Sequence, residues 1–496
     1  MTPLASRFGA ALSFSSANFR EDNMIRKTLC AVLVACVGTT ATFMPGPVHA
    51  EGESLRERLT YSRAVEAVIW SLPLMNFKAM RDGHKETVGL EFNDVAFNSK
   101  VQDWRLQITT PNNTTPYVMA FWDVSEGPVV IEIPPSEPDV GLFGVIMDSW
   151  QRPLEDVGAR GKDQGLGGKY LVMPPNYRGA LPVGGYIPLH QKTNQGYFLL
   201  RPLIADTSDE NLQKAEAFVK KIQIYPLAEA DSPPATRHVD TYGISLNALP
   251  EFDGSYFEAL HEIIQQEVVL EQDLAFMGLL DAIGIRKGLE FAPDESMRGV
   301  FDTAAKESLQ YLIEQFHNIS NVKYYDDREW TTIAPPGRLE TDYSWVFPTY
   351  IALEDRGAYF QPIFSSVKTF GAATFYLSNA KDSDGNWLEG GKNYKFTVPA
   401  DAPVKNFWSV IAYDLETGAF IPEMERDGIA SSTAGVETNA DGSVDVYFGP
   451  TAPEGKEANF VPTADGRKYF LLFRFYGPEP AVFDKSWKLN NFELQE

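Results

Sequence analysis

Apolar and polar residues alternate in two long parts of the chain, with the two-residue period of a half-buried β-strand. The clearest case in the C-terminal part is 444–448, and the run 470–473 is continuously apolar, as in a strand covered on both faces. Segments of the same kind, separated by Gly and Pro, predict strands over 117–124, 129–133, 142–147 and 169–173. This spacing is typical of a β-sandwich or jelly roll.

In other parts of the chain, apolar residues recur with the spacing of an α-helix. An apolar stripe at positions 65, 68, 69 and 72 predicts a helix from Glu51 to about Gly83, which Pro73 should end or kink. Further helices are expected over 206–221, along two stripes between 257 and 316, and over 345–366.

These elements predict a fold that is mainly β with helical insertions, an α+β fold. In it, two β-sandwich or jelly-roll-like domains are bridged by a helical region. The expected ranges are a leader and signal peptide over 1–50, an N-terminal helix and sandwich over 51–230, a helical bridge over 231–370 and a C-terminal sandwich over 371–496.

The start of the chain has the pattern of a secretory signal peptide near residues 24–50. A basic segment at 24–27 precedes an apolar run at 29–37, and small residues lead up to Ala50. We therefore expect cleavage after Ala50 and a periplasmic or secreted protein, with acylation at Cys36 as an open alternative. Cys30 and Cys36 are the two cysteines, so the mature chain would contain no disulfide and no thiol nucleophile.

The composition and charge of the chain limit the classes of partner that it can bind. The 496 residues include 67 Asp and Glu against 43 Lys and Arg, a net charge of −24, and are 44% hydrophobic. Such a chain can bury a large core and repels phosphate backbones and anionic membrane surfaces. A small-molecule ligand is therefore expected, with no nucleic acid and no membrane after signal cleavage. Self-association through sheet faces or helices, giving a homo-oligomer, stays open.

Two sets of motifs resemble a known pair of families. The C-terminal segments 407–414, 439–443, 459–462 and 473–478 resemble domain of unknown function 1214. The N-terminal segments 110–117, 122–123 and 127–130 resemble domain of unknown function 1254. The two occur together in bacterial secreted or periplasmic proteins, so the resemblance implies export and agrees with the two-sandwich architecture. It assigns no chemistry.

The loop before the strand at 117–124 is the most suggestive binding feature. Asn112, Asn113, Thr115 and Tyr117 supply amides, a hydroxyl and an aromatic ring that can orient a ligand at the mouth of a sandwich. An Asx-turn that starts the strand is the alternative. In the resembled family an aspartate usually stands where this chain has Thr114, and that departure puts an activity based on this carboxylate in doubt.

Six further residues are candidates for the site, and each could equally be a core or ion-paired residue. Asp148 and Arg160 are predicted to be catalytic. The others are predicted to bind substrate: Trp150, Trp345, Arg356 and Trp408. Arg160 lies in the glycine-rich segment 158–169, which lacks the spacing of a phosphate-binding loop and is expected to be a mobile β–β loop or a substrate lid.

The sequence lacks the common motifs for metal binding and for a serine nucleophile, and its two Ser-x-x-Lys matches, at 365–368 and 378–381, have no companion motifs. It has no His-x-His, no His-Glu-x-x-His and no Gly-x-Ser-x-Gly. His317 is expected to be a cation near a helix C-terminus. No cofactor is predicted, and a divalent metal held by carboxylates stays open. The expected function is a hydrolase or lyase acting on a small, partly aromatic molecule in a pocket between domains, or alternatively a non-catalytic periplasmic ligand-binding or assembly protein.

Overall fold

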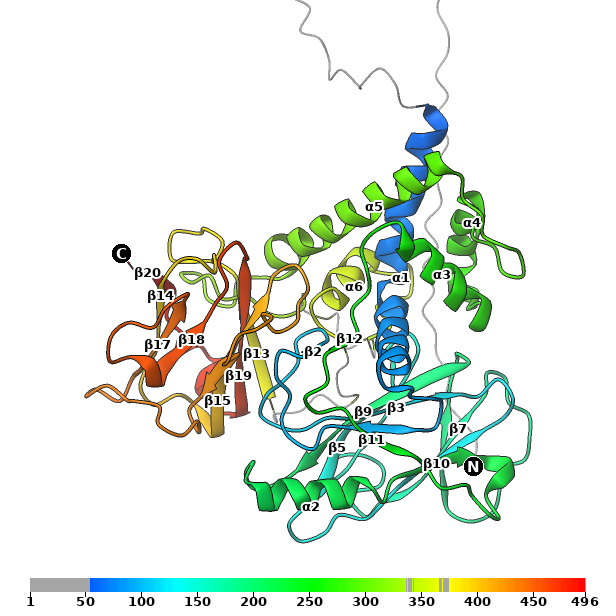
Figure 1. Ribbon diagram of the computed structural model, residues 1–496, viewed down its shortest axis with the longest axis horizontal. Helices are drawn as coiled ribbons and strands as arrows, with labels where there is room; N and C mark the ends of the chain where they lie inside the picture. The colour runs from blue at the N-terminus through cyan, green and yellow to red at the C-terminus, as the bar shows by residue number, and fades with distance from the viewer. Residues whose placement is uncertain are drawn as a thin grey trace, which may run out of the picture. The chain divides into compact units, whose positions relative to one another are not determined.

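The computed structural model describes residues 54–335, 337, 341, 343–364, 368 and 374–495 (Figure 1). The predicted signal peptide and both cysteines lie outside the described residues. Helices and sheets both contribute substantially, which confirms the predicted α+β fold. Among the described helices, none combines the length and the apolar content that crossing a bilayer requires.

The first helix, α1 (Leu55–Val88), begins at a capping box in which Ser54 and Glu57 bond each other's backbone N–H groups. The helix extends beyond the expected end near Gly83, to Val88, and Pro73 lies inside it and does not end it. A proline leaves nearby carbonyls without their helical donors. Here side chains from other helices donate instead: Arg356 Nη2 bonds Trp70 O at 2.7 Å, and the hydroxyl of Tyr256 bonds Val68 O at 3.3 Å.

The N-terminal half contains two sheets. The larger has the order β11-β1-β3-β9-β5-β6 and the smaller the order β10-β4-β7-β8. Their bounds are β1 Val95–Phe97, β3 Val118–Asp123, β4 Val129–Ile133, β5 Gly141–Asp148, β6 Pro153–Val157, β7 Gly168–Met173, β8 Tyr186–His190, β9 Gln195–Leu203, β10 Gln223–Pro226 and β11 His238–Asp240. Apolar residues of both sheets share one buried cluster, which helix α2 (Asp209–Val219) joins through Phe218.

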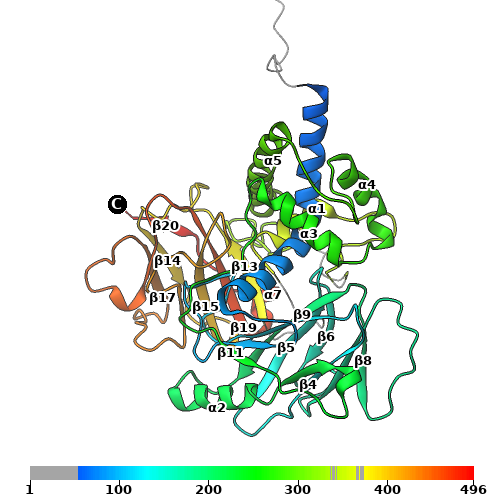
Figure 2. The same ribbon diagram turned by 45° about the vertical axis from the view of Figure 1, so that its right-hand side comes forward.

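Helix α1 covers the other face of the six-stranded sheet. Phe77 contacts the ring of Tyr197 in β9 at 5.6 Å between centroids and that of Phe121 in β3 at 6.0 Å. Figure 2 shows the C-terminal part of α1 running over these strands. Alternation along β9 places Arg201 on the same face as Tyr197. The register pairs Asp148 of β5 with Gly196 at the opposite end of β9 from Arg201, so the two ends of the sheet are about 17 Å apart along this strand.

Further helices pack around α1 (Figure 1) and share two buried clusters with it. They are α3 (Ser255–Gln266), α4 (Leu274–Ala282), α5 (Glu295–Glu314), which continues into η3 (Gln315–Ser320), and α6 (Leu353–Phe360), with η2 (Glu271–Asp273) between α3 and α4. The helix predicted over 345–366 is shorter than expected. Tyr343 and Trp345 adopt φ values of 55° and 58°, which a right-handed helix does not admit.

The C-terminal half contains two four-stranded sheets, with orders β13-β19-β15-β16 and β18-β17-β14-β20. Their bounds are β13 Thr374–Asn379, β14 Tyr394–Val398, β15 Val404–Asp414, β16 Gly428–Ala430, β17 Val444–Gly449, β18 Phe460–Pro462, β19 Tyr469–Pro478 and β20 Phe492–Leu494. The two sheets share an aromatic core in which Trp408 stacks on Phe473 at 5.4 Å.

Short elements complete the described fold. β2 (Leu106–Gln107) pairs in parallel with β12 (Leu246–Asn247), η1 spans Leu227–Glu229, η5 spans Glu457–Asn459, and α7 spans Pro480–Phe483.

Candidate functional site

The turn between β5 and β6 presents Trp150 and Arg152. The Asp148 carboxylate organises this turn: Oδ1 accepts the backbone N–H groups of Trp150 at 2.9 Å and Arg152 at 3.1 Å. Its Oδ2 accepts Arg152 Nε at 2.7 Å and lies 2.6 Å from Arg152 Nη2. Asp148 is 1% exposed. With both oxygens engaged, Asp148 holds the turn in shape and thereby positions Trp150 and Arg152.

The same turn is fixed against α1. Gln151 Nε2 donates to Pro73 O at 2.8 Å, and its Oε1 accepts the hydroxyl of Tyr197 at 3.1 Å. Trp150 then lies against Trp70 of α1, with centroids 5.1 Å apart. Trp70 stacks in turn on Phe276 of α4, at 5.4 Å and an interplanar angle of 3°. An aromatic wall is therefore built from three elements.

Arg356 of α6 lies over this wall. Its guanidinium carbon is 5.1 Å from the centroid of Trp150, within the range of a cation–π contact. Nη2 is used by Trp70 O, as described above, whereas the buried Nε has no hydrogen-bond partner among the described residues. Burial lowers the pKa of Arg356 to about 10, against the attraction of Asp273. At neutral pH the side chain still carries its charge.

Two buried carboxyl groups lie on the other side of Trp150. Glu267 accepts the backbone N–H of Asn194 at 2.7 Å and that of Gln195 at 2.9 Å. Burial raises its pKa to about 7, even though these hydrogen bonds favour the charged form. Asp273 accepts Trp70 Nε1 at 3.1 Å, and burial raises its pKa as well. Glu267 can therefore take up or release a proton near neutral pH.

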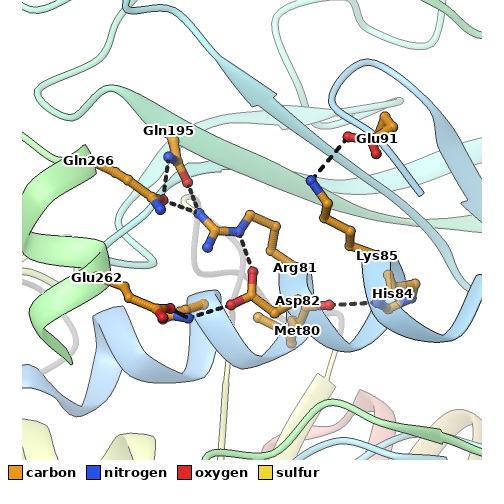
Figure 3. A network of polar contacts seen from close by, with 10 residues as sticks. Met80, Arg81, Asp82, His84, Lys85, Glu91, Gln195, Glu262 and Gln266 are labelled. Atoms are coloured by element: carbon orange, nitrogen blue, oxygen red, sulfur yellow. Dashed lines mark hydrogen bonds and ion pairs between the residues drawn. The ribbon is translucent and has the colours of Figure 1, made fainter. Parts of the chain in front are cut away.

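A polar network connects α1 and α3 with Gln195 of β9 (Figure 3). Arg81 is its centre: Nε bonds Asp82 at 2.7 Å, and Nη1 donates to the amide oxygens of Gln195 and, at 2.8 Å, Gln266. Gln195 Nε2 also donates to Gln266 at 3.1 Å. Because Gln195 is one of the two residues that donate to Glu267, this network positions the carboxyl group.

Two narrow cavities flank Trp150. The first, about 10 Å³, is lined by Trp70, Trp150, Glu267 and Asp273, with apolar residues of α1, α3 and the 268–270 segment. The second, of similar size, is lined by Trp150, Arg152, Gln272, Tyr343, Ser344 and Arg356. Each has room for about one water molecule. We call this arrangement the Trp150 site: Trp70, Trp150, Arg152, Glu267, Asp273 and Arg356 around the two cavities. A larger ligand requires the lining segments to move apart.

The structure distributes the predicted site residues over several places. Asp148, Trp150 and Arg356 meet at the Trp150 site, and Trp345 packs on Tyr359 in the adjoining buried cluster. The loop with Asn112, Asn113, Thr115 and Tyr117 lies at the opposite end of the six-stranded sheet, beside the C-terminal sheets. Arg160 is exposed in the loop between β6 and β7. Trp408 belongs to the C-terminal core. Asn112, Tyr117, Asp148 and Arg160 therefore do not converge on one cavity.

Four residues of the Trp150 site are not found by sequence reasoning: Trp70, Arg152, Glu267 and Asp273. No motif marks them, and Glu267 gains its chemistry only from burial against residues 194–195 on a distant strand. The one local signal is the neighbourhood of Trp70 and Pro73, where a helix interior contains a proline. Within the described ranges, no three His, Cys, Asp or Glu side chains gather closely enough to hold a metal ion.

Of two solved structures compared with this chain, the first supports the fold alone. The VPA0106 protein from Vibrio parahaemolyticus is 15% identical, with a TM-score of 0.51 over 88% of this chain and 100% of that one. A putative uncharacterized protein from Burkholderia cenocepacia is 12% identical, with a TM-score of 0.38 over 88% and 94%. A search of the curated proteins gives no match.

Family models match one segment in each half of the chain and confirm the resemblance in its motifs. Residues 92–226 match a protein of unknown function (DUF1254), and residues 373–480 match a second protein of unknown function (DUF1214). The Trp150 turn lies in the first match, whereas Glu267, Asp273 and Arg356 lie between the two. The chain therefore belongs to the proteins that pair a DUF1254 domain with a DUF1214 domain.

Proposed function

We propose that this protein is an enzyme, a hydrolase or a lyase, that binds a small and partly aromatic molecule at the Trp150 site. The observation that carries the proposal is Glu267, a buried carboxyl group with a pKa near 7 that lines a tryptophan-walled cavity. Perturbed titratable groups beside a cavity are typical of active sites. Trp70 and Trp150 would receive the planar part of the molecule.

Each polar group has a distinct role in this proposal. Glu267, as carboxylate, would take a proton from a water molecule in the first cavity. For an ester, the water oxygen then bonds to the carbonyl carbon, the C–O bond breaks, and the leaving alcohol takes the proton back. Arg356, which carries a positive charge and an unused Nε–H, would stabilise the negative charge that develops on the carbonyl oxygen. A lyase would use the same base to remove a proton from carbon.

A non-catalytic ligand-binding protein is the second candidate. Two observations favour it. Both carboxylate oxygens of Glu267 already accept backbone hydrogen bonds, which is also what a purely structural carboxylate does. Thr114 stands where an aspartate is usual in the resembled family. A molecule that is recovered unchanged from native protein and binds at Trp150 would support this alternative.

A turnover screen tests the proposal. The purified chain is assayed against aryl esters, lactones and amides, with and without added divalent metal ions. We expect hydrolysis of at least one aromatic ester or lactone, with a pH profile that rises through about pH 7 as Glu267 ionises. Binding without turnover across the panel would favour the second candidate.

Export forms part of the same proposal. A chain cleaved after Ala50 would act on its ligand in the periplasm or outside the cell. A homo-oligomer also remains an expectation, and sedimentation velocity of the mature chain measures it directly.

A further inference from the structure

A second cluster of functional groups lies where the two matched domains meet, at the opposite end of the six-stranded sheet from the Trp150 site. Arg201 of β9 and Tyr117, just before β3, come from the first domain. Arg474 and Tyr476 of β19 and Tyr413 of β15 come from the second. The guanidinium groups of Arg201 and Arg474 lie close enough to interact electrostatically. The cluster therefore exists only when both domains are packed together.

The two arginines bring positive charge that no carboxylate of the described residues neutralises. Neither forms an ion pair with an acidic side chain of the described residues, and Arg474 is 4% exposed. Tyrosine rings cover their faces instead: Arg201 lies 5.0 Å from the centroid of Tyr117, and Arg474 lies 5.5 Å from Tyr376 and 5.6 Å from Tyr413. Burial raises the pKa of Tyr413, so its hydroxyl remains neutral. An unpaired buried charge such as that of Arg474 is costly, and a second positive charge beside it adds to the cost.

The hydrogen bonds of the cluster leave donors unused. Arg474 Nη2 donates to the hydroxyl of Tyr413 at 2.7 Å, but the buried Nη1 has no partner among the described residues. The hydroxyl of Tyr476 accepts Asn112 Nδ2 at 3.1 Å, and that of Tyr117 accepts Asn112 N at 2.7 Å and Arg201 Nη2 at 3.4 Å. The Tyr117 hydroxyl acts only as an acceptor in these bonds and retains its own proton to donate, whereas the Tyr476 hydroxyl is also hydrogen-bonded to Thr114.

Two further features prepare the cluster for a ligand. The loop that carries Asn112 is anchored to the C-terminal domain, because Pro111 O accepts the hydroxyl of Tyr413 at 2.6 Å and Thr110 N donates to Gly418 O at 2.6 Å. Thr110 has a φ of 40°, which is unusual for a β-branched residue. Arg201 is partly exposed, so solvent reaches one side of the cluster.

We infer that Arg201, Arg474, Tyr117, Tyr476 and Asn112 form a binding site for a small oxyanion, a carboxylate or a phosphate group. An oxyanion accepts several charge-assisted hydrogen bonds at once and supplies the missing negative charge. This inference is independent of the Trp150 site.

Isothermal titration and thermal unfolding test the site with two probes, inorganic phosphate and benzoate. We expect at least one probe to bind saturably to the full mature chain and to raise its Tm in proportion to the logarithm of its concentration. Saturation by phosphate alone would identify a phosphate site, and saturation by benzoate alone a carboxylate site. No saturable response to either probe would overturn the inference.

Substitutions in the cluster test whether the probe binds there. Arg474→Met and Tyr476→Phe should each weaken it at least tenfold, and Arg286→Met, which removes an exposed arginine paired with Asp281 on the surface, should leave it unchanged. Tyr476→Phe removes only a hydroxyl and keeps the ring stacked on Phe407, so it reports on binding even if Arg474→Met fails to fold. Wild-type affinity in Tyr476→Phe would contradict the assignment.

Discussion

Glu267 combines two properties that can be separated by experiment: it is buried at 3% exposure, and it accepts two backbone N–H groups that favour its charged form. Burial dominates, and the pKa rises from 4.5 to about 7. Because the folded chain then holds this proton more tightly than the unfolded chain, the associated stability is fully present below pH 4.5. It is lost as the pH rises through 7.

The pH dependence of stability should therefore change in the variant Glu267→Gln. Between pH 5 and pH 8, the wild type should lose stability relative to this variant, by an amount on the order of 3 kcal/mol. Urea unfolding at both pH values measures it, with Glu258→Gln, an exposed residue on α3 paired with Arg298, as the control. If the free energies of unfolding of wild type and Glu267→Gln change in parallel with pH, the pKa of Glu267 is not raised in the folded chain.

His317 shows how burial overturns an inference from position. Its place near a helix C-terminus predicts a cation, and this is wrong because the ring is buried between Phe316, Trp387 and Phe470. Burial, with Lys381 nearby, lowers its pKa to about 3. The sequence contains the neighbouring Phe316, but Trp387 and Phe470 come from the distant C-terminal half.

The ring of His317 should consequently show no titration between pH 5 and pH 8. Proton NMR of the histidine Cε1–H signals, assigned with His317→Gln, measures this. The stability that the neutral ring contributes is present above pH 6.5 and is lost as the pH falls towards 3, since the folded pKa is lower than the unfolded one. A midpoint near 6.5 would mean that the ring is solvated.

At the scale of elements, strands and helices with a strong period could be predicted, whereas the ends of the helices could not. The strand expected over 129–133 has those bounds, and the one over 169–173 differs by one residue. Helix α6 illustrates the limit, because positive φ values at Tyr343 and Trp345 depend on tertiary contacts that no local pattern reveals. Site residues follow the same rule: Trp150 and Arg356 could be selected by type, whereas Glu267 and Arg201 become notable only through partners far away in sequence.

The turn between β5 and β6 depends on one side chain that connects it to α1. In Gln151→Ala, the carbonyl of Pro73 and the hydroxyl of Tyr197 both lose their buried partner. We expect a loss of about 1–3 kcal/mol in the free energy of unfolding. Gln164→Ala, an exposed glutamine in the loop after β6 that also has a positive φ of 50°, should change it by less than about 0.5 kcal/mol. Equal effects would show that the Gln151 bonds contribute nothing.

At the scale of the whole molecule, each candidate site depends on parts that are distant in sequence. The Trp150 site combines residues of the six-stranded sheet with residues of helices that come before and after residue 300 in the sequence. The proposed oxyanion site combines residues of the DUF1254 and DUF1214 domains. This explains why neither domain alone displays a complete set of functional groups. It also means that the chain has to be tested as one piece.

The mature N-terminus is a prediction at this scale. If the segment near residues 24–50 is a cleaved signal peptide, expression in a bacterial host should yield a periplasmic protein whose first residue is Glu51. Intact mass and N-terminal sequencing of the periplasmic fraction measure it. A lipid-modified Cys36 at the N-terminus would instead support the lipoprotein alternative.

The central claim is that Glu267 acts as a general base at a tryptophan-walled site. The most direct measurement is the initial rate at pH 8 on the best aryl ester of the screen, for wild type, Glu267→Gln and Glu258→Gln. Positioned general bases contribute about 10²–10⁴ in rate, so we predict a loss of at least a hundredfold in Glu267→Gln and an unchanged rate in Glu258→Gln. Equal turnover by folded wild type and Glu267→Gln would contradict the account.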